Sequence, residues 1–278
     1  MMHSLVCANV ADVNSNETGC GWTPLVRAAE KGSNEVVRAL LENRAIIDVA
    51  TEPRGWTPLY AAAANGHVAV VNTLIQGGAD VNQEESRHGA TPLYIAAQNG
   101  HVQVVVILLR AGGDTEKALS EEADNVLGTR TASAMEVCGN AGGYTHAAAT
   151  PLYTAAEQGH VEVVRALLED GAITDVATEP RGFTPLYAAA ANGYVAVVNT
   201  LVQGGADVNQ EESRHGATPL YIAAQNGHVQ VVEILLRAGG DTEKALSEEA
   251  DNVLGTRTAS RKIFPERSLL GSRGNIST

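Results

Sequence analysis

One short motif recurs at a fixed interval along most of this chain. Gly-x-Thr-Pro-Leu begins at Gly21, Gly55 and Gly89 and again at Gly182 and Gly216, with 34 residues between neighbours in each group. A shorter version, Thr-Pro-Leu from Thr150, lies 34 residues before its counterpart in the second group. A fixed period in this range is typical of a solenoid, in which each unit covers the apolar face of its neighbour.

Each unit predicts two helices and a loop, as residues 55–88 illustrate. Thr57 and Pro58 form a helix start, because the threonine hydroxyl can accept from the N–H of Tyr60 and proline needs no N–H there. A short alanine-rich helix is expected over residues 59–64, ending at Asn65-Gly66. From His67 onward the apolar residues have helical spacing, which predicts a second helix that ends at Gly77-Gly78. Stacked units should approach more closely along the alanine-rich side and make it concave.

A longer repeat contains the short one. Residues 45–133 return as residues 172–260 with five substitutions. The exchanged pairs are Ile47/Thr174, Trp56/Phe183, His67/Tyr194, Ile75/Val202 and Val106/Glu233. The start of the central insertion, residues 115–133, recurs after the last unit, so the insertion began as the flank of a copied block. A dedicated functional loop remains the alternative.

The repeated unit resembles the ankyrin repeat. The matching residues are Thr57-Pro58-Leu59-Tyr60-Ala61-Ala62, Asn65-Gly66-His67-Val68 and Gly78-Ala79-Asp80-Val81-Asn82. Six units match, over about residues 21–114 and 150–241. The resemblance implies an all-α ankyrin-repeat solenoid of stacked helix–turn–helix units with protruding hairpin loops. The family's TPLH histidine is replaced here by tyrosine, and by Val26 in the first unit.

The repeats divide the chain into five parts. Residues 1–20 are expected to be a truncated preceding repeat, because Ala11-Asp12-Val13-Asn14 precedes Gly21 as Ala79–Asn82 precedes Gly89. Repeats 1–3 occupy 21–114 and repeats 4–6 occupy 150–241. Residues 115–149 form an insertion with a degenerate repeat, and 242–278 a C-terminal capping helix and disordered tail. The capping helix is predicted over 244–254, with its copy over 117–127.

Charge and cysteine content restrict the partners and the compartment. The formal net charge is −13 with acidic residues spread through the loops, whereas a nucleic-acid surface needs a clustered basic face. Cys7, Cys20 and Cys138 lack metal-site spacing, which favours free thiols in a reducing compartment. The N-terminus lacks a signal-peptide pattern and the chain has no apolar run that could span a bilayer. We expect an intracellular monomer, cytoplasmic or else nuclear, without metal or cofactor and without membrane insertion.

The sequence does not support catalysis. His67, His101, His160 and His228 occupy the same slot of their repeats, which favours a structural role over a metal or catalytic one. Gly139–Gly143 lacks the lysine and preceding strand of a phosphate loop. Acidic pairs such as Glu84-Glu85 are interpreted as solvated loop positions. An enzyme that uses the 115–149 insertion is the disfavoured alternative.

The resemblance places partner binding on the concave face and the hairpin tips, and implies a non-catalytic scaffold or adaptor for a protein partner. The candidate residues are Trp22, Glu52, Arg54, Trp56, Arg87, His88, Glu179, Arg181, Phe183, Arg214 and His215. The three aromatic residues are the sharpest candidates, with packing over a neighbouring hairpin as the alternative. A second hypothesis makes the chain the targeting arm of a larger signalling or ubiquitin-pathway protein whose effector domain is absent. Two equal blocks also allow bivalent binding, but a recent duplication that has not diverged is the favoured explanation.

Overall fold

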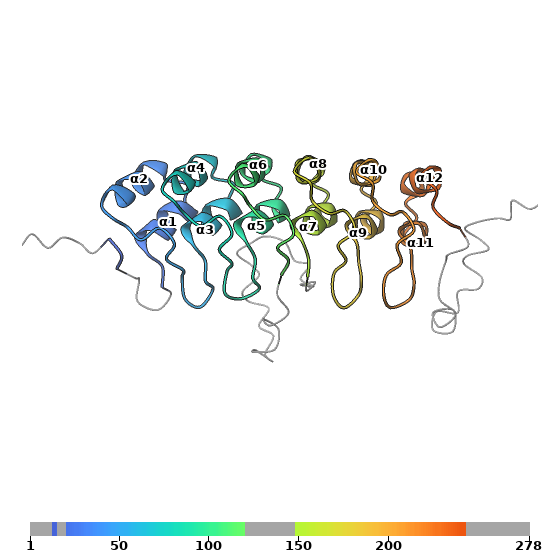
Figure 1. Ribbon diagram of the computed structural model, residues 1–278, viewed down its shortest axis with the longest axis horizontal. Helices are drawn as coiled ribbons and strands as arrows, with labels where there is room; N and C mark the ends of the chain where they lie inside the picture. The colour runs from blue at the N-terminus through green and yellow to red at the C-terminus, as the bar shows by residue number, and fades with distance from the viewer. Residues whose placement is uncertain (1–12, 16–20, 120–147, 243–278) are drawn as a thin grey trace, which may run out of the picture.

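The computed structural model describes residues 13–15, 21–119 and 148–242, and within these ranges it contains twelve helices in two rows (Figure 1). One row holds the first helix of every unit: α1 (Pro24–Glu30), α3 (Pro58–Ala64), α5 (Pro92–Gln98), α7 (Pro151–Gln158), α9 (Pro185–Asn192) and α11 (Pro219–Gln225). The other row holds the second helices: α2 (Asn34–Glu42), α4 (Val68–Gln76), α6 (Val102–Arg110), α8 (Val161–Glu169), α10 (Val195–Gln203) and α12 (Val229–Arg237). Hairpin loops project from the side of the first row. The predicted all-α solenoid is confirmed.

Threonine and glycine determine where the first helices begin and end. Each of the six begins after a threonine whose hydroxyl accepts from a backbone N–H three residues later, at 3.1–3.3 Å, with proline as the first helical residue. Gly66 follows α3 with φ +70°, the left-handed conformation that glycine adopts without a Cβ penalty. The sequence rule for these ends is therefore correct to within a residue.

The histidine at the start of four second helices, α4, α6, α8 and α12, is a link between repeats. His67 does not cap α4 with its side chain; its Nε2 donates instead to the Glu30 carbonyl of the preceding repeat, at 2.9 Å. His101, His160 and His228 make the same bond at 3.0 Å. The predicted structural role is confirmed, and the bond joins the helix rows of consecutive units.

The core is built from small side chains on the first row and branched ones on the second. In repeat 2, Ala63 packs with Val71 and Leu74, and all three are completely buried. The same triplet recurs in the other inner repeats. Because neighbouring helices in both rows contact one another in chain order, this core continues from α1 to α12.

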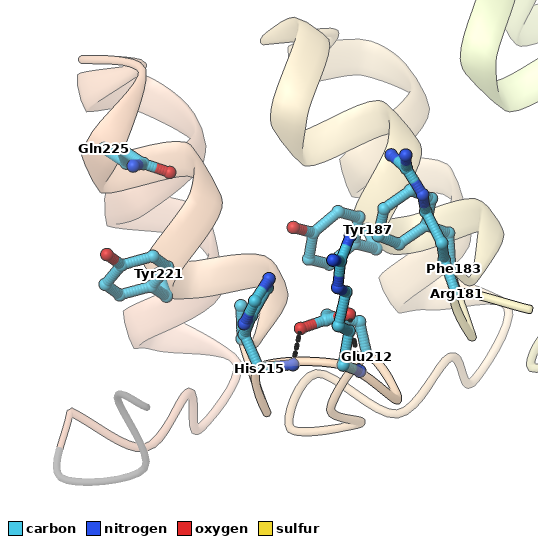
Figure 2. Close-up of a pocket in the computed structure, with 9 residues that line it drawn as sticks. Arg181, Phe183, Tyr187, Glu212, His215, Tyr221 and Gln225 are labelled. Carbon is cyan, nitrogen blue, oxygen red and sulfur yellow. Dashed lines mark hydrogen bonds between the residues drawn. The ribbon is translucent and has the colours of Figure 1, made fainter. Parts of the chain in front are cut away.

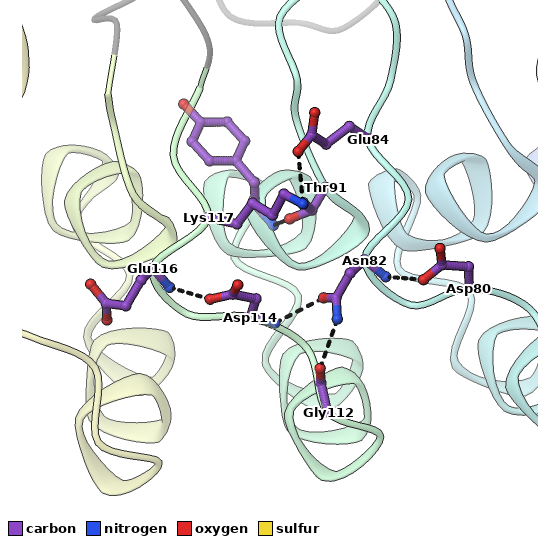
Figure 3. Close-up of polar contacts among 9 residues, drawn as sticks. Asp80, Asn82, Glu84, Thr91, Gly112, Asp114, Glu116 and Lys117 are labelled. Carbon is purple, nitrogen blue, oxygen red and sulfur yellow. Dashed lines mark hydrogen bonds and ion pairs between the residues drawn. The ribbon is translucent and has the colours of Figure 1, made fainter.

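A ladder of side-chain oxygens fastens the loops at the base of the hairpins. Asp48, Asn82, Asp175 and Asn209 each accept from a backbone N–H of the next repeat, and Asn14 and Glu116 do the same at the N-terminus and at the centre, all at 2.7–3.2 Å. Figure 3 shows the central steps, where Asn82 also donates to the Gly112 carbonyl at 2.9 Å. Burial is the main cause of a raised pKa at the Asp48 carboxyl. The Asn14 bond extends the ladder to residues 13–15.

The stack is continuous across the insertion. Helix α5 packs on α7, and the His160 ring donates to the Gln98 carbonyl across the junction. Leu119 and Ala149 pair through the Leu119 N–H and the Ala149 carbonyl at 3.2 Å, as Thr51 and Trp56 pair in the hairpin between repeats 1 and 2. Ala148 has φ +60°, where the other hairpins have glycine. The described residues on either side of the insertion thus pair as the base of a hairpin does.

The helix predicted over 117–127 is wrong at its start. Residues 117–119 are hairpin backbone, because Leu119 pairs with Ala149 and the Lys117 ammonium lies 2.9 Å from a Glu84 carboxylate oxygen. This ion pair raises the pKa of Lys117. The rest of that helix, the degenerate repeat, the C-terminal capping helix and the tail lie outside the described residues, as do residues 1–12.

Candidate partner-binding surface

The hairpins display short turns that are fixed at their base. In the hairpin between repeats 1 and 2, Thr51 bonds Trp56 through both its N–H and its hydroxyl, which leaves residues 52–55 as the turn. In the next hairpin a glutamate replaces the threonine. The Glu85 carboxylate accepts from the N–H groups of Arg87, at 2.8 Å, and of His88.

This capping corrects the expectation that Glu84-Glu85 is solvated. Glu84 is exposed, but Glu85 is only 4% exposed, and its copy Glu212 is buried in the same way. Glu212 accepts from the N–H of Arg214, at 2.9 Å, and of His215. Each buried carboxylate therefore holds the turn in one shape, with the Arg and His side chains carried on its outer side.

Aromatic rings line the neighbouring hairpins. Trp22 and Trp56 meet edge to face with their centroids 5.9 Å apart, and Trp56 lies 5.7 Å from the Tyr60 ring. Phe183 instead stacks on Tyr187 at 4.7 Å, with the two planes only 5° apart. Every one of these rings therefore packs against another ring, and Trp22, Trp56 and Phe183 each stay partly exposed.

Arginine side chains cover the outer faces of the same rings. The Arg27 guanidinium carbon lies 4.2 Å from the Trp22 ring centroid, and that of Arg54 lies 4.9 Å from Trp56. Arg181 is 5.8 Å from Phe183. Such cation–π pairs contribute about 0.5–1 kcal/mol at exposed sites. Each aromatic position therefore presents a positive charge on an apolar base.

The tyrosines that replace the TPLH histidine form a second apolar row beneath the hairpins. Tyr60, Tyr94 and Tyr153 are buried with Leu119 and Ala149 in one cluster. Burial raises the pKa of Tyr94 and Tyr153 far above the ordinary value, and that of Tyr187 to about 12. Tyr60, Tyr94 and Tyr153 therefore serve as packing.

A pocket of about 120 Å³ opens between the hairpins that follow α8 and α10 (Figure 2). Its walls are the rings of Phe183, Tyr187 and Tyr221, and its rim carries the cationic or titratable side chains of both hairpins. The complete lining is Arg181, Phe183, Tyr187, Glu212, Arg214, His215, Ala217, Tyr221 and Gln225. The hollow is mostly aromatic, with a few polar groups around it, as is usual for binding pockets.

Family models and solved structures agree on what this arrangement is. A model described as ankyrin repeats (3 copies) matches residues 1–85, 51–118 and 131–212, and a single ankyrin-repeat model matches 215–245. The chain belongs to the ankyrin-repeat family. No curated protein matches it significantly. Ankyrin repeats are generally protein–protein interaction modules and are typically non-catalytic.

Two solved ankyrin domains show the same fold. The human ASB11 ankyrin repeat domain is 27% identical with a TM-score of 0.62, and the match covers 80% of this chain and 86% of that one. An ankyrin repeat domain from Acinetobacter baumannii AYE is 26% identical with a TM-score of 0.63, covering 78% of this chain and 98% of that one.

The ankyrin array brings some of the predicted residues together and separates others. Four of them, Arg181, Phe183, Arg214 and His215, line the pocket, and Trp22 touches Trp56. Glu52 and Glu179 are exposed at their turns. Arg54, Arg87 and His88 occupy the matching places of the first block. Whether any of them binds a partner stays a prediction.

Five residues of the pocket lining are not among the candidates that the sequence predicts: Tyr187, Glu212, Ala217, Tyr221 and Gln225. Tyr187 and Tyr221 occupy the motif position where the family has histidine, and no sequence pattern marks Gln225 as a pocket residue. A usable signal was the Glu-Ser-Arg-His turn, where a glutamate two and three residues before N–H donors can cap them.

Within the described ranges, no group of three or more His, Cys, Asp or Glu side chains is placed to hold a metal ion. No helix in that part of the chain is long and apolar enough to cross a membrane.

Proposed function

We propose that this ankyrin array is a non-catalytic scaffold or adaptor that binds a protein partner through its hairpin tips and the exposed edge of the first helices. The partly exposed row of rings under arginine side chains is the observation that carries the proposal. Tryptophan, tyrosine and arginine are the residues enriched at the energetic centres of protein interfaces.

The geometry also favours binding over a purely structural role for these rings. Trp22, Trp56 and Phe183 each keep an accessible part beside an arginine, where a partner can reach them. Their ring–ring contacts hold them in place before a partner arrives. Ordering that is already present in the free protein reduces the entropy lost on binding.

The proposal includes a monomer in a reducing, intracellular compartment, and the compartment is supported by three cysteines without metal-site spacing. The alternative role as the targeting arm of a larger protein keeps the same surface and differs only in what is attached to it.

Affinity capture from an extract of the source cells tests the surface. The chain and a Trp22/Trp56/Phe183→Ala variant are compared, and a protein captured by the wild type should be lost, since truncating interface anchors costs about 2 kcal/mol or more each. A Val36/Val229→Ala variant is the control, because both valines are exposed on the second-helix row. Circular dichroism melting verifies that the variants fold.

Equal capture by the wild type and the aromatic variant would refute this surface. If the aromatic variant does not fold, an Arg54/Arg181→Glu variant tests the same surface, because both arginines lie on the outer face of the hairpins. It should also lose the captured protein. Loss of the captured protein by the valine control alone would place binding on the opposite row.

A further inference from the structure

The pocket between the last two described hairpins has a rigid rim. The Ser213 N–H donates to the Arg181 carbonyl at 2.8 Å and joins the two turns, and the Glu212 carboxylate holds the second turn from inside. The backbone that carries Arg181, Arg214 and His215 is therefore fixed from two directions. Arg181 of the first hairpin and Arg214 of the second both line the pocket, and Figure 2 shows Arg181 beside Phe183.

The residues that line this pocket carry more positive than negative charge, whereas the chain as a whole is acidic. Two arginines line the pocket with one carboxylate, that of Glu212, which is only 5% exposed and is directed at backbone N–H groups. The chain carries a net charge of −13. A ligand attracted here needs negative groups close to the rim, because charges more than about 8–10 Å away are screened at physiological salt.

The floor of the pocket selects an apolar group. Phe183 and Tyr187 form a stacked pair, and Ala217, which is buried, also lines the pocket. Burying one aliphatic or aromatic side chain against such a surface contributes about 1.5–3 kcal/mol. Gln225 adds an amide that can bond a peptide backbone.

We infer that this pocket binds an acidic peptide segment of a protein partner, with one apolar side chain seated on Phe183 and Tyr187 and flanking Asp or Glu carboxylates on Arg181 and Arg214. Arginine suits carboxylates because its guanidinium donates two parallel hydrogen bonds to one group. The inference rests on the proposed function and specifies the chemistry of its partner.

The duplication supplies a matched control. Arg54, Arg87 and His88 repeat the rim in the first block, but there Tyr94 is buried against Leu119 and Tyr153, whereas its copy Tyr221 lines the open pocket. The first copy thus has the charges without the same accessible ring. Identical substitutions in the two copies should have unequal effects.

The test uses fluorescein-labelled nine-residue peptides with a central leucine and Asp/Glu, Gln or Lys flanks, titrated with the full chain by anisotropy. Acidic peptides should bind at least about tenfold more tightly than the Gln series and weaken as salt rises. Replacing the central leucine by serine should weaken binding by about tenfold. The Arg181/Arg214→Ala variant should lose about tenfold or more, and the Arg54/Arg87→Ala variant less than about twofold.

Equal binding of acidic and basic peptides, equal losses in the two arginine variants, or no acidic binding up to millimolar protein would overturn the inference. Leu246, the copy of Leu119, lies outside the described residues. Binding by a Leu246→Ser variant but not by the wild type would assign the pocket to the chain's own C-terminal segment, and would also overturn it.

The two proposals fail separately. If no peptide binds but the aromatic variant still loses its captured protein, the acidic-peptide inference is wrong and the proposed function stands. If that protein is retained by the aromatic variant, the proposed surface is wrong whatever the peptides do.

Discussion

Repeats 3 and 6 have almost the same sequence but lie in different surroundings within the stack. Residues 89–119 and their copies from Gly216 onward differ only at Val106/Glu233 among the described positions. Repeat 3 is covered by repeat 4, and there Leu109 is 8% exposed; the copy, Leu236, is 40% exposed. Val105 is completely buried, whereas Val232 is only partly so. The presence or absence of a following repeat, and not the residue type, therefore determines how deeply each of these side chains is buried.

The one substitution between these repeats follows the same logic. Val106 is partly buried in the inner repeat, whereas Glu233 is exposed and lies 3.5 Å from the Arg237 guanidinium. Exposed ion pairs of this kind contribute only about 0–1 kcal/mol, so the exchange serves solvation more than stability. A solenoid needs a polar outer face on its end units.

The largest predicted difference comes from truncating the same leucine in both repeats. Leu109→Ala should destabilise the array by about 2–5 kcal/mol, because it leaves a cavity at the junction with repeat 4. Leu236→Ala should cost about 1 kcal/mol, since much of its side chain is already in water. Urea unfolding followed by circular dichroism measures both. Equal losses would mean that repeat 6 is covered as completely as repeat 3.

A smaller difference is expected at a pair of glycines with left-handed backbone. A Cβ on Gly100 would lie 2.7 Å from the His160 ring, while one on Gly227 meets no described atom within 4 Å. Both alanine variants lose about 1–2 kcal/mol from the positive φ. Gly100→Ala should lose about 1 kcal/mol more, because the ring that bonds the Gln98 carbonyl must move.

Hydrogen exchange of the α7 and α8 amides locates this extra loss at the junction. Faster exchange there in Gly100→Ala, but not in Gly227→Ala, is the expected pattern. Identical hydrogen-exchange rates in the two variants would show that the His160 contact does not contribute to the stability of the junction.

The smallest effect is predicted where the copies differ. Tyr194 takes the place of His67, and no hydrogen bond from its ring to the preceding repeat is among the described contacts. Tyr194→His should add the missing inter-repeat bond, to the Glu157 carbonyl, and stabilise the array by about 0.5–1.5 kcal/mol. His67→Tyr should lose a similar amount. Thermal melting of the two single variants and of the His67→Tyr/Tyr194→His double variant measures the sign of each stability change. A lower melting temperature for Tyr194→His would contradict the stabilising role of the histidine bond between repeats.

The sequence predicted the helices well because their ends depend on local chemistry. Thr57 and Gly66 act on residues three or four positions away, and such rules can be read in one unit. The His67–Glu30 bond and the Asp48–Asp80 bond join different units, so their partners were not predictable from one motif.

The candidate surface was predicted only in part, for a related reason. The exposed arginines and rings at the hairpins were found, but Glu85 was misread, because its burial depends on a turn that folds back on its own carboxylate. Tyr221 lines the pocket, whereas its copy Tyr94 is covered by Leu119 and Tyr153, because the two repeats have different positions in the stack. A motif that is repeated six times does not show which of its copies is covered by a neighbouring repeat.

The longer connection between repeats 3 and 4 also affects how the array assembles. The bond from the ring at the start of α8 to α5 spans 62 residues of chain, whereas the equivalent bond between repeats 1 and 2 spans 37. Doubling a loop costs about 0.6 kcal/mol in closure entropy, so the longer span changes the equilibrium by less than that. Hairpin tips can therefore accept new sequence at little energetic cost, while docking of the two halves becomes the least local step of folding.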